Sequence, residues 1–101
     1  MKPFTAQVAV VLLLKKGPSY GRRLCEGIRE RDWAVCSEPG LYGRVLPALL
    51  EADLVELVPA EVRRRLEKKD PPPQGRIRHW YRLTPAGHVE ASKLILAAAA
   101  A

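Results

Sequence analysis

The chain of 101 residues has little of several residue types that build common scaffolds and sites, with only two cysteines and two histidines. Two cysteines cannot form a disulfide framework, so we interpret Cys25 and Cys36 as reduced thiols that act as small buried hydrophobic residues, with a redox role as the alternative. His79 and His88 each stand alone, without Cys, Asp or Glu at ligand spacing. We therefore expect no metal and no other cofactor.

The sequence also lacks the arrangements that enzymes and membrane proteins need. It has no nucleophile with a plausible base, no paired carboxylates and no glycine-rich phosphate loop before a helix, so we expect no enzymatic activity. The apolar run at residues 6–14 is far shorter than the ~20 residues of a membrane span. It ends at Lys15-Lys16 without a small-residue cleavage pattern, which is not typical of a signal peptide. We expect a cytoplasmic protein.

Acidic residues are outnumbered, since 17 Lys and Arg against 11 Asp and Glu give a formal net charge of +6. Between residues 59 and 82, eight basic residues face three acidic ones, so an excess of five charges lies in one segment. A charge run of this kind is often only a solvated loop. Its place in the strand pattern described below instead favours a polyanionic partner such as nucleic acid.

Apolar periodicity predicts three helices in the first half of the chain. The first covers residues 5–16 and is apolar almost all round, which indicates burial on more than one side. A glycine and a proline end it, and Ser19 is placed to cap a second helix over residues 20–31. Ser37 is the expected N-cap of a third helix that ends near Asp53.

The third helix is expected to present its polar side chains to a partner. Its apolar residues recur at i, i+3, i+4 and i+7, which predicts a buried face made of Tyr42, Val45, Leu46 and Leu49. Pro47 interrupts this pattern, because an interior proline removes a hydrogen bond and should bend or shorten the helix.

Two strands joined by a long basic connection follow. Residues 54–58 are β-branched and half-alternating, and residues 77–83 alternate strictly, so we predict an antiparallel hairpin. In the second strand the inward side chains should be Ile77, His79, Tyr81 and Leu83, and the outward ones Arg76, Arg78, Trp80 and Arg82. The connection contains a marginally helical basic stretch and three prolines in a row. Thr84 is the expected N-cap of a final helix that extends to about Leu96.

The order helix, helix, helix, strand, basic tip, strand, helix is that of a winged helix-turn-helix domain, so the predicted fold is mainly α with a small β-hairpin. We expect one domain over residues 1–101, with the helix-turn-helix and wing in residues 5–83. Residues 84–101 then form a C-terminal helix available for dimerisation. In such a fold the third helix enters the major groove and the basic hairpin lies on the phosphate backbone.

Three segments resemble the PadR-like family of winged-helix transcriptional regulators, and the resemblance covers residues 5–92. Residues 17–21, Gly-Pro-Ser-Tyr-Gly, are similar to that family's turn between helices one and two. Residues 49–56 are similar to the exit from its recognition helix. Residues 75–87 are the most specific, because an Arg-rich, Tyr-containing strand there ends in Leu-Thr-Pro-x-Gly. The resemblance implies a dimeric DNA-binding regulator.

The start of the third helix departs from that family. The family commonly has Gly-Thr-Leu-Tyr-Pro where this chain has Gly-Leu-Tyr-Gly-Arg at residues 40–44. Alignment on Gly40 is preferred, since it puts Tyr42 in the core with the other apolar residues. Alignment on Leu41-Tyr42 shifts every position by one. Both alignments leave few polar groups to contact bases.

Two sets of candidate DNA contacts follow from the predicted fold. The candidates for contact with bases are Ser37, Leu41, Tyr42 and Arg44. The candidates for contact with the DNA backbone are Tyr20, Arg22, Arg63, Arg64, Arg65, Lys68, Lys69, Arg76, Arg78 and Arg82.

The predicted function is that of a sequence-specific regulator of transcription that binds double-stranded DNA, a repressor located at the nucleoid. It is expected to form a homodimer through the first and last helices. The alternative is a winged-helix protein-interaction or assembly module with little sequence-specific DNA binding. The sequence points to no particular small-molecule effector and to no membrane contact.

Overall fold

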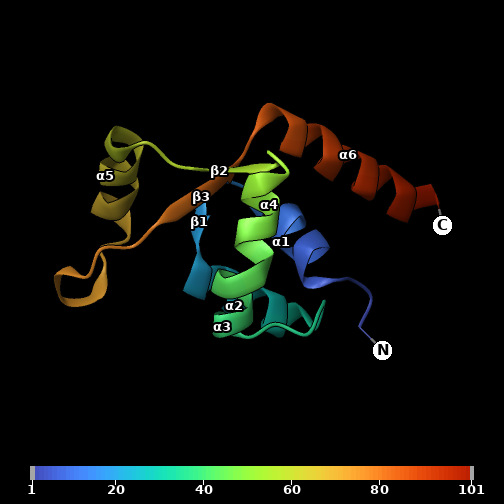
Figure 1. Ribbon diagram of the computed structural model, residues 1–101, viewed down its shortest axis with the longest axis horizontal. Helices are drawn as coiled ribbons and strands as arrows, with labels where there is room; N and C mark the ends of the chain where they lie inside the picture. Colours follow the sequence, from blue (N-terminus) through green and yellow to red (C-terminus); the bar gives the residue numbers. More distant parts are fainter. Residues whose placement is uncertain (1, 101) are drawn as a thin grey trace.

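Helices flank a small antiparallel sheet in the computed structural model, which describes residues 2–100 (Figure 1). The elements of the first half are α1 (Ala6–Leu14), β1 (Ser19–Tyr20), α2 (Gly21–Arg31), α3 (Glu38–Gly40), the π-helical turn η1 (Leu41–Val45) and α4 (Leu46–Glu51). The second half adds β2 (Val55–Leu57), α5 (Ala60–Lys69), the 3-10 turn η2 (Pro73–Gly75), β3 (Trp80–Leu83) and α6 (Pro85–Ala100). The arrangement is mainly helical with a three-stranded antiparallel sheet, which is compatible with a winged-helix-like fold.

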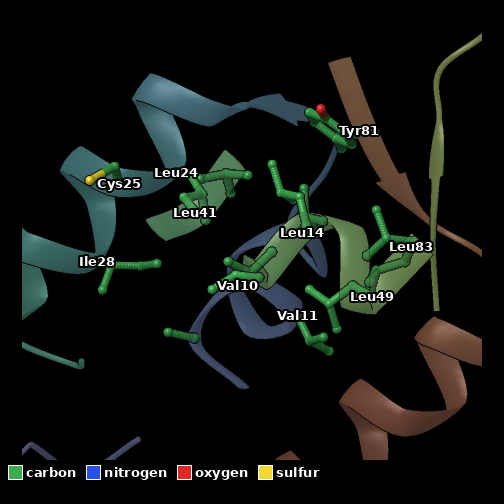
Figure 2. Close-up of a cluster of buried hydrophobic side chains, with 14 of the residues drawn as sticks. Val10, Val11, Leu14, Leu24, Cys25, Ile28, Leu41, Leu49, Tyr81 and Leu83 are labelled. Carbon is green, nitrogen blue, oxygen red and sulfur yellow. The ribbon is translucent and has the colours of Figure 1, made fainter. Parts of the chain in front are cut away.

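Helix α1 lies at the centre of the core, in keeping with its nearly continuous apolar sequence. Thr5 caps the helix, since its hydroxyl accepts a hydrogen bond of 3.3 Å from the N–H of Val8. Val10 and Leu14 are 0% and 1% exposed. Around them the core cluster joins α1 to α2, to the segments η1 and α4, and to β3 (Figure 2). Full burial of each such aliphatic side chain contributes about 1.5–3 kcal/mol.

The start of α2 differs from the prediction, because Tyr20 and not Ser19 occupies the N-cap position. Ser19 belongs to β1, where it pairs with Tyr81 of β3. The Ser19 hydroxyl accepts a hydrogen bond of 2.9 Å from Nε of Arg23. Pairing with β3 has drawn Ser19 into the sheet, so its side chain serves the contact between α2 and the strand instead of the helix start.

Segments α3, η1 and α4 form one continuous helix over residues 38–51, which we call the third helix. The Ser37 hydroxyl accepts a hydrogen bond of 3.1 Å from the N–H of Gly40, which confirms the predicted N-cap. Pro47 lacks an N–H, and its ring would clash with the carbonyl four residues earlier in a regular α-helix. The wider π turn just before Pro47 relieves that clash while the helix continues.

The π turn also changes which residue is buried at the start of this helix, while Val45, Leu46 and Leu49 are buried as predicted. Leu41 is 1% exposed and lies in the core, whereas Tyr42 is 49% exposed, so the placement of Tyr42 on the buried face is wrong. In the π turn, Leu41 and Leu46 come to the same side although they are five residues apart. The sequence pattern assumed a regular 3.6-residue period, which the helix does not keep here.

The sheet has the order β1-β3-β2, with β3 in the middle and antiparallel to both neighbours. Val55 pairs with Leu83 and Leu57 with Tyr81, which confirms the predicted hairpin. The strand β1 was not predicted. Its two residues have no recognisable alternation, and only the pairing with β3 makes them a strand.

The two faces of β3 agree with the predicted alternation only in part. Tyr81 and Leu83 are 7% and 4% exposed and face the core, as predicted. Trp80 was expected on the solvent side but is 2% exposed, because Tyr20 covers it with a ring-to-ring distance of 5.1 Å. Ile77 is 82% exposed, and His79 is exposed as well, so their inward placement is wrong. The chain joins the sheet only at Trp80, so the residues before it have no core to face.

Helix α5 stands away from the rest of the molecule, at the end opposite α6 (Figure 1). It forms the first part of the connection between β2 and β3, which we call the wing (residues 58–79). Every residue of α5 is exposed or half-buried. The predicted marginal helical stretch is therefore a full helix of ten residues, held in place by little apolar packing.

Helix α6 begins at the predicted position and packs against α1 (Figure 1). The Thr84 hydroxyl accepts a hydrogen bond of 3.0 Å from the N–H of Gly87, which confirms the predicted cap. The same hydroxyl donates to the carbonyl oxygen of Asp53 at 2.6 Å and so ties α6 to the end of the third helix. The helix continues to Ala100, beyond the predicted end near Leu96.

Candidate nucleic-acid interface

The exposed side of the third helix carries the side chains that could contact bases. Tyr42 and Arg44 are both exposed near its start, as is Ser37, whose hydroxyl is engaged in the cap. Leu41, which was also a candidate, is buried and so cannot reach a groove. Base contact by the other three stays a prediction.

The ring of Tyr42 packs against α2 at Gly21, where a larger residue would displace it. A Cβ atom at Gly21 would lie 2.2 Å from Oη of Tyr42, so the absence of a side chain there makes room for the phenol. Partial burial, together with the nearby charge of Glu38, raises the pKa of Tyr42 above its usual value. A tyrosine of ordinary pKa is already protonated at neutral pH, and the upward shift keeps the hydroxyl a possible hydrogen-bond donor at still higher pH.

Helix α5 presents a stripe of positive charge. Its exposed cations form two pairs, and the two members of each pair are four residues apart. The second pair is one residue further along than the first, so all four cations lie along one side of the helix. This α5 stripe consists of Arg64, Arg65, Lys68 and Lys69. Arg63 differs from them, because it is half-buried and its Nε lies 3.6 Å from a carboxylate oxygen of Glu67. Four of the five candidates in this helix are thus free to meet a polyanion.

The arginines of the returning segment are less free than predicted. Arg76 is exposed. Arg82 instead donates from Nε to the carboxylate of Glu56 at 2.7 Å across the β2–β3 pair. The side chain of Arg78 is 13% exposed and is bound to Asp70. The placement of Arg78 as an outward-pointing residue is therefore wrong, because its side chain is drawn to Asp70 and largely buried. Arg82 lies on the outer face of β3, opposite Tyr81 and Leu83, as predicted, but it is paired with Glu56.

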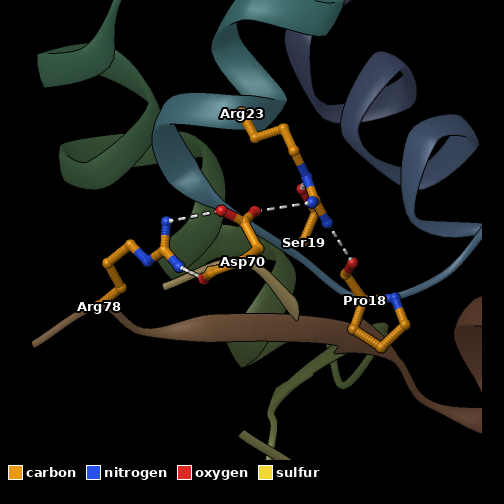
Figure 3. A network of polar contacts seen from close by, with 5 residues as sticks. All are labelled: Pro18, Ser19, Arg23, Asp70 and Arg78. Atoms are coloured by element: carbon orange, nitrogen blue, oxygen red, sulfur yellow. Dashed lines mark hydrogen bonds and ion pairs between the residues drawn. The ribbon is translucent and has the colours of Figure 1, made fainter. Parts of the chain in front are cut away.

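A cluster of three charged side chains joins the wing to α2 (Figure 3). We call Arg23, Asp70 and Arg78 the wing clamp. Arg23 donates from Nη1 to Oδ2 of Asp70 at 3.2 Å and from Nη2 to the carbonyl oxygen of Pro18 at 2.8 Å. Arg78 lies with Nη1 3.7 Å from Oδ1 of Asp70 and also donates to the backbone carbonyl of Asp70. One carboxylate thus holds two guanidinium groups.

Two aromatic rings lie beneath these guanidinium groups. The Cζ atom of Arg78 is 3.9 Å from the centre of the Tyr20 ring, and the Cζ atom of Arg23 is 5.1 Å from the ring centres of Tyr20 and Trp80. Such contacts of a cation with an aromatic face are stabilising, more so where water is excluded. Tyr20, a candidate for the DNA backbone, is therefore mainly occupied with the arginines of the clamp.

A groove of about 620 Å³ separates the wing from α2 and the third helix. Its body side includes Arg22 and Tyr42, and its wing side includes Arg76 and His79. Arg22 pairs only loosely with Glu26 at 3.3 Å, and both side chains are largely exposed. Acidic side chains balance the arginines of this lining, so the groove itself has no formal net charge, and the exposed cations of the α5 stripe lie outside it.

Arg23 and Asp70 belong to this region but were not singled out from the sequence. They are 47 residues apart, and nothing in their local surroundings marks them as partners. The single hint was that Asp70 is the only acidic residue between Glu67 and Glu90. A contact between two such distant residues has no periodicity or spacing by which to find it.

Two further features were sought among the described residues, a membrane-spanning helix and a metal-binding cluster. Among residues 2–100, no helix is long and apolar enough to cross a membrane. Within the same range, His, Cys, Asp and Glu side chains do not gather in groups of three or more that could hold a metal ion.

Comparisons with known proteins agree with the class of fold described above. No family model matches the chain, and no curated protein matches it, so the resemblance to the PadR-like family stays a prediction. Among solved structures, the chain is similar to the circadian clock associated protein Pex from Anabaena, with 22% identity and a TM-score of 0.56. The match covers 92% of this chain and 77% of that chain. At this identity the likeness concerns the fold alone.

Proposed function

We propose that this chain is a sequence-specific, double-stranded DNA-binding regulator of transcription, a repressor without enzymatic activity that acts at the nucleoid. The observation that carries the proposal is that the exposed start of the third helix and the returning part of the wing line one groove, while the same wing carries the four exposed cations of the α5 stripe. The fold shared with Pex and the resemblance of residues 5–92 to PadR-like regulators support it. The residues divide into two roles.

The third helix would enter the major groove, whose width of about 12 Å admits an α-helix. Arg44 and Tyr42 are both exposed close to its N-terminal end and, being two residues apart, they point to different sides of the helix. Arginine donates two hydrogen bonds to O6 and N7 of guanine, which is the commonest specific contact in such complexes. The few polar groups on this helix favour a short or degenerate target sequence.

The wing would lie along the phosphate backbone. The α5 stripe and Arg76 offer five exposed cations that can replace condensed counterions. Contacts of this kind position the protein on the duplex without selecting a sequence. The affinity should therefore fall steeply as salt rises.

A homodimer would present two such units to the DNA. Val89 and Leu96 of α6 are 57% and 69% exposed, and they are seven residues apart on the side of the helix that faces away from the core. Exposed apolar residues on one helix side favour contact with another protein surface. The same helix of a second copy, together with the outer side of α1, would fit the dimer expected from the sequence.

Fluorescence anisotropy with DNA from upstream of the gene, compared with a scrambled duplex at several salt concentrations, tests the proposal. Preferential binding of the upstream duplex is the expected result. Substitution Arg44→Ala should reduce that preference, whereas Arg76→Ala should weaken both duplexes alike. Equal binding of both duplexes would indicate a sequence-tolerant DNA binder. Absence of binding at low salt would favour the interaction module instead.

A further inference from the structure

We infer that Asp70 is a positioning residue that sets the orientation of the wing through the wing clamp, and that Arg78 serves this clamp instead of binding phosphate. The inference about DNA binding rests on the proposed function, but the clamp itself can be tested without DNA.

The position of Asp70 in the chain gives it this role. It follows directly after α5 and is the residue at which the chain turns from α5 into the proline-rich part of the wing. Its carboxylate contacts Arg23 on α2, and its carboxylate and carbonyl contact Arg78 on the chain that returns to β3. Asp70 therefore links the outgoing part of the wing to the returning part and to the body of the protein at once.

Helix α5 has little else to hold it in place. Every one of its residues is exposed or half-buried, so apolar packing contributes little to its orientation. Without the clamp, the orientation of the α5 stripe relative to the body would be set only by the connecting residues 71–79 and their flexibility. A mobile wing must lose conformational entropy when it binds a duplex, which lowers the affinity even though the same side chains meet the DNA.

The surroundings of Arg78 argue against direct phosphate contact. Its side chain is 13% exposed, its guanidinium lies 3.9 Å from the ring centre of Tyr20, and two of its nitrogens face Asp70. To reach a phosphate it would have to leave both partners. By contrast, Arg76 and the α5 stripe are exposed and need no such rearrangement.

Glu56 provides a matched control for Asp70. The Asp70 and Glu56 side chains are 38% and 39% exposed, and each pairs with an arginine of the segment that leads into or forms β3. Asp70→Asn and Glu56→Gln each remove one negative charge, so the two variants have the same net charge. A difference between the two variants therefore does not come from the net charge.

The first measurement is amide hydrogen exchange of the full chain without DNA. Asp70→Asn should speed the exchange of residues 60–78 by roughly three- to tenfold, while Glu56→Gln leaves that segment unchanged and Asp70→Glu restores most of the protection. Exchange of α1 serves as the reference for intact folding. Unchanged exchange of residues 60–78 in Asp70→Asn would overturn the inference, whatever the protein does with DNA.

The second measurement is the salt dependence of DNA binding by the same variants. Asp70→Asn should bind both duplexes roughly threefold or more weakly than Glu56→Gln, with a similar slope of log affinity against log salt. Tighter binding with a steeper slope would mean that Asp70 only blocks Arg23 and Arg78 from phosphate, which would overturn the positioning role. Faster exchange in Asp70→Asn combined with no DNA binding by any variant would support the clamp and refute the proposed function.

Discussion

Three glycines in helices meet different surroundings, and the difference decides what a side chain would do at each. A Cβ atom at Gly87 would lie 2.0 Å from the carbonyl oxygen of Leu54, and one at Gly21 would meet the Tyr42 ring. At Gly43, no heavy atom among the described residues outside the local backbone would come within 4 Å. The first two glycines therefore permit close packing, while the third only lowers the helix propensity of its segment.

Gly87→Ala should destabilise the protein by roughly 1–3 kcal/mol, because the methyl group forces α6 away from the end of the third helix. Gly43→Ala is the matched control and should be neutral or stabilising by about 0.5–1 kcal/mol. Urea unfolding followed by circular dichroism measures both. A Gly87→Ala variant as stable as the parent would contradict the close approach to Leu54.

Cys36 is expected to react slowly with alkylating reagents. Burial, followed by a hydrogen bond to Cys25, raises the pKa of the Cys36 thiol to about 11. Since the thiolate is the nucleophile, alkylation at pH 8 should be on the order of a hundredfold slower than for an ordinary exposed cysteine. The rate should then rise about tenfold per pH unit up to pH 10. Peptide mass spectrometry after iodoacetamide treatment measures this, and a rate that levels off below pH 9 would contradict the raised pKa.

At the scale of the element, the wing combines an ordered helix with very little packing. Its charge is arranged by the helical repeat, which places the α5 stripe on one side and the Arg63–Glu67 pair on another. A helix so poorly buried is unusual inside a small domain, since isolated helices of this length are marginal in water. Contacts with a bound partner would supply the packing that this helix lacks within its own chain.

The double variant Arg64→Ala with Lys68→Ala tests the α5 stripe. If each residue neutralises one phosphate, the slope of log affinity against log salt should become less steep by about 0.9 for each phosphate that is no longer neutralised. Arg63→Ala serves as the control in the same helix, because Arg63 is already paired with Glu67. Titrations of one duplex over a range of salt concentrations give the slopes. An unchanged slope in the double variant would remove α5 from the interface.

At the scale of the whole molecule, the wing and α6 extend to opposite ends of a body with principal extents of 44 × 27 × 24 Å (Figure 1). The basic surface lies at one end and the exposed apolar residues of α6 at the other. Two copies joined through α6 would therefore keep both wings free for a duplex.

Leu96→Glu should weaken the proposed dimer by roughly tenfold or more, because the interface would have to bury a carboxylate without a partner. Ala98→Glu, which adds the same charge about half a turn away on the same helix, is the matched control and should leave association unchanged. Light scattering coupled to size-exclusion chromatography over a range of concentrations measures the molar mass. Equal masses for both variants at every concentration would exclude α6 as the dimer interface.

Several local features of this protein follow from the sequence alone. The caps at Ser37 and Thr84, the α-rich character and the antiparallel hairpin were all predicted, because each depends on residues close together in the chain or on a strong alternation of residue types. The candidate base contacts Tyr42 and Arg44 were also identified, although the preferred register placed Tyr42 on the wrong side.

Only the tertiary structure decided the remaining features, because they depend on groups that are distant in sequence. The burial of Leu41 follows from a π turn that departs from the regular helical period near Pro47. The burial of Trp80 depends on Tyr20, which lies 60 residues earlier in the chain. Arg78 is of a residue type that often binds phosphate, yet the folded chain pairs it with Asp70 and Tyr20. Side-chain periodicity states which way a residue points along an ideal element, whereas the partner it meets there is set by the packing of the whole chain.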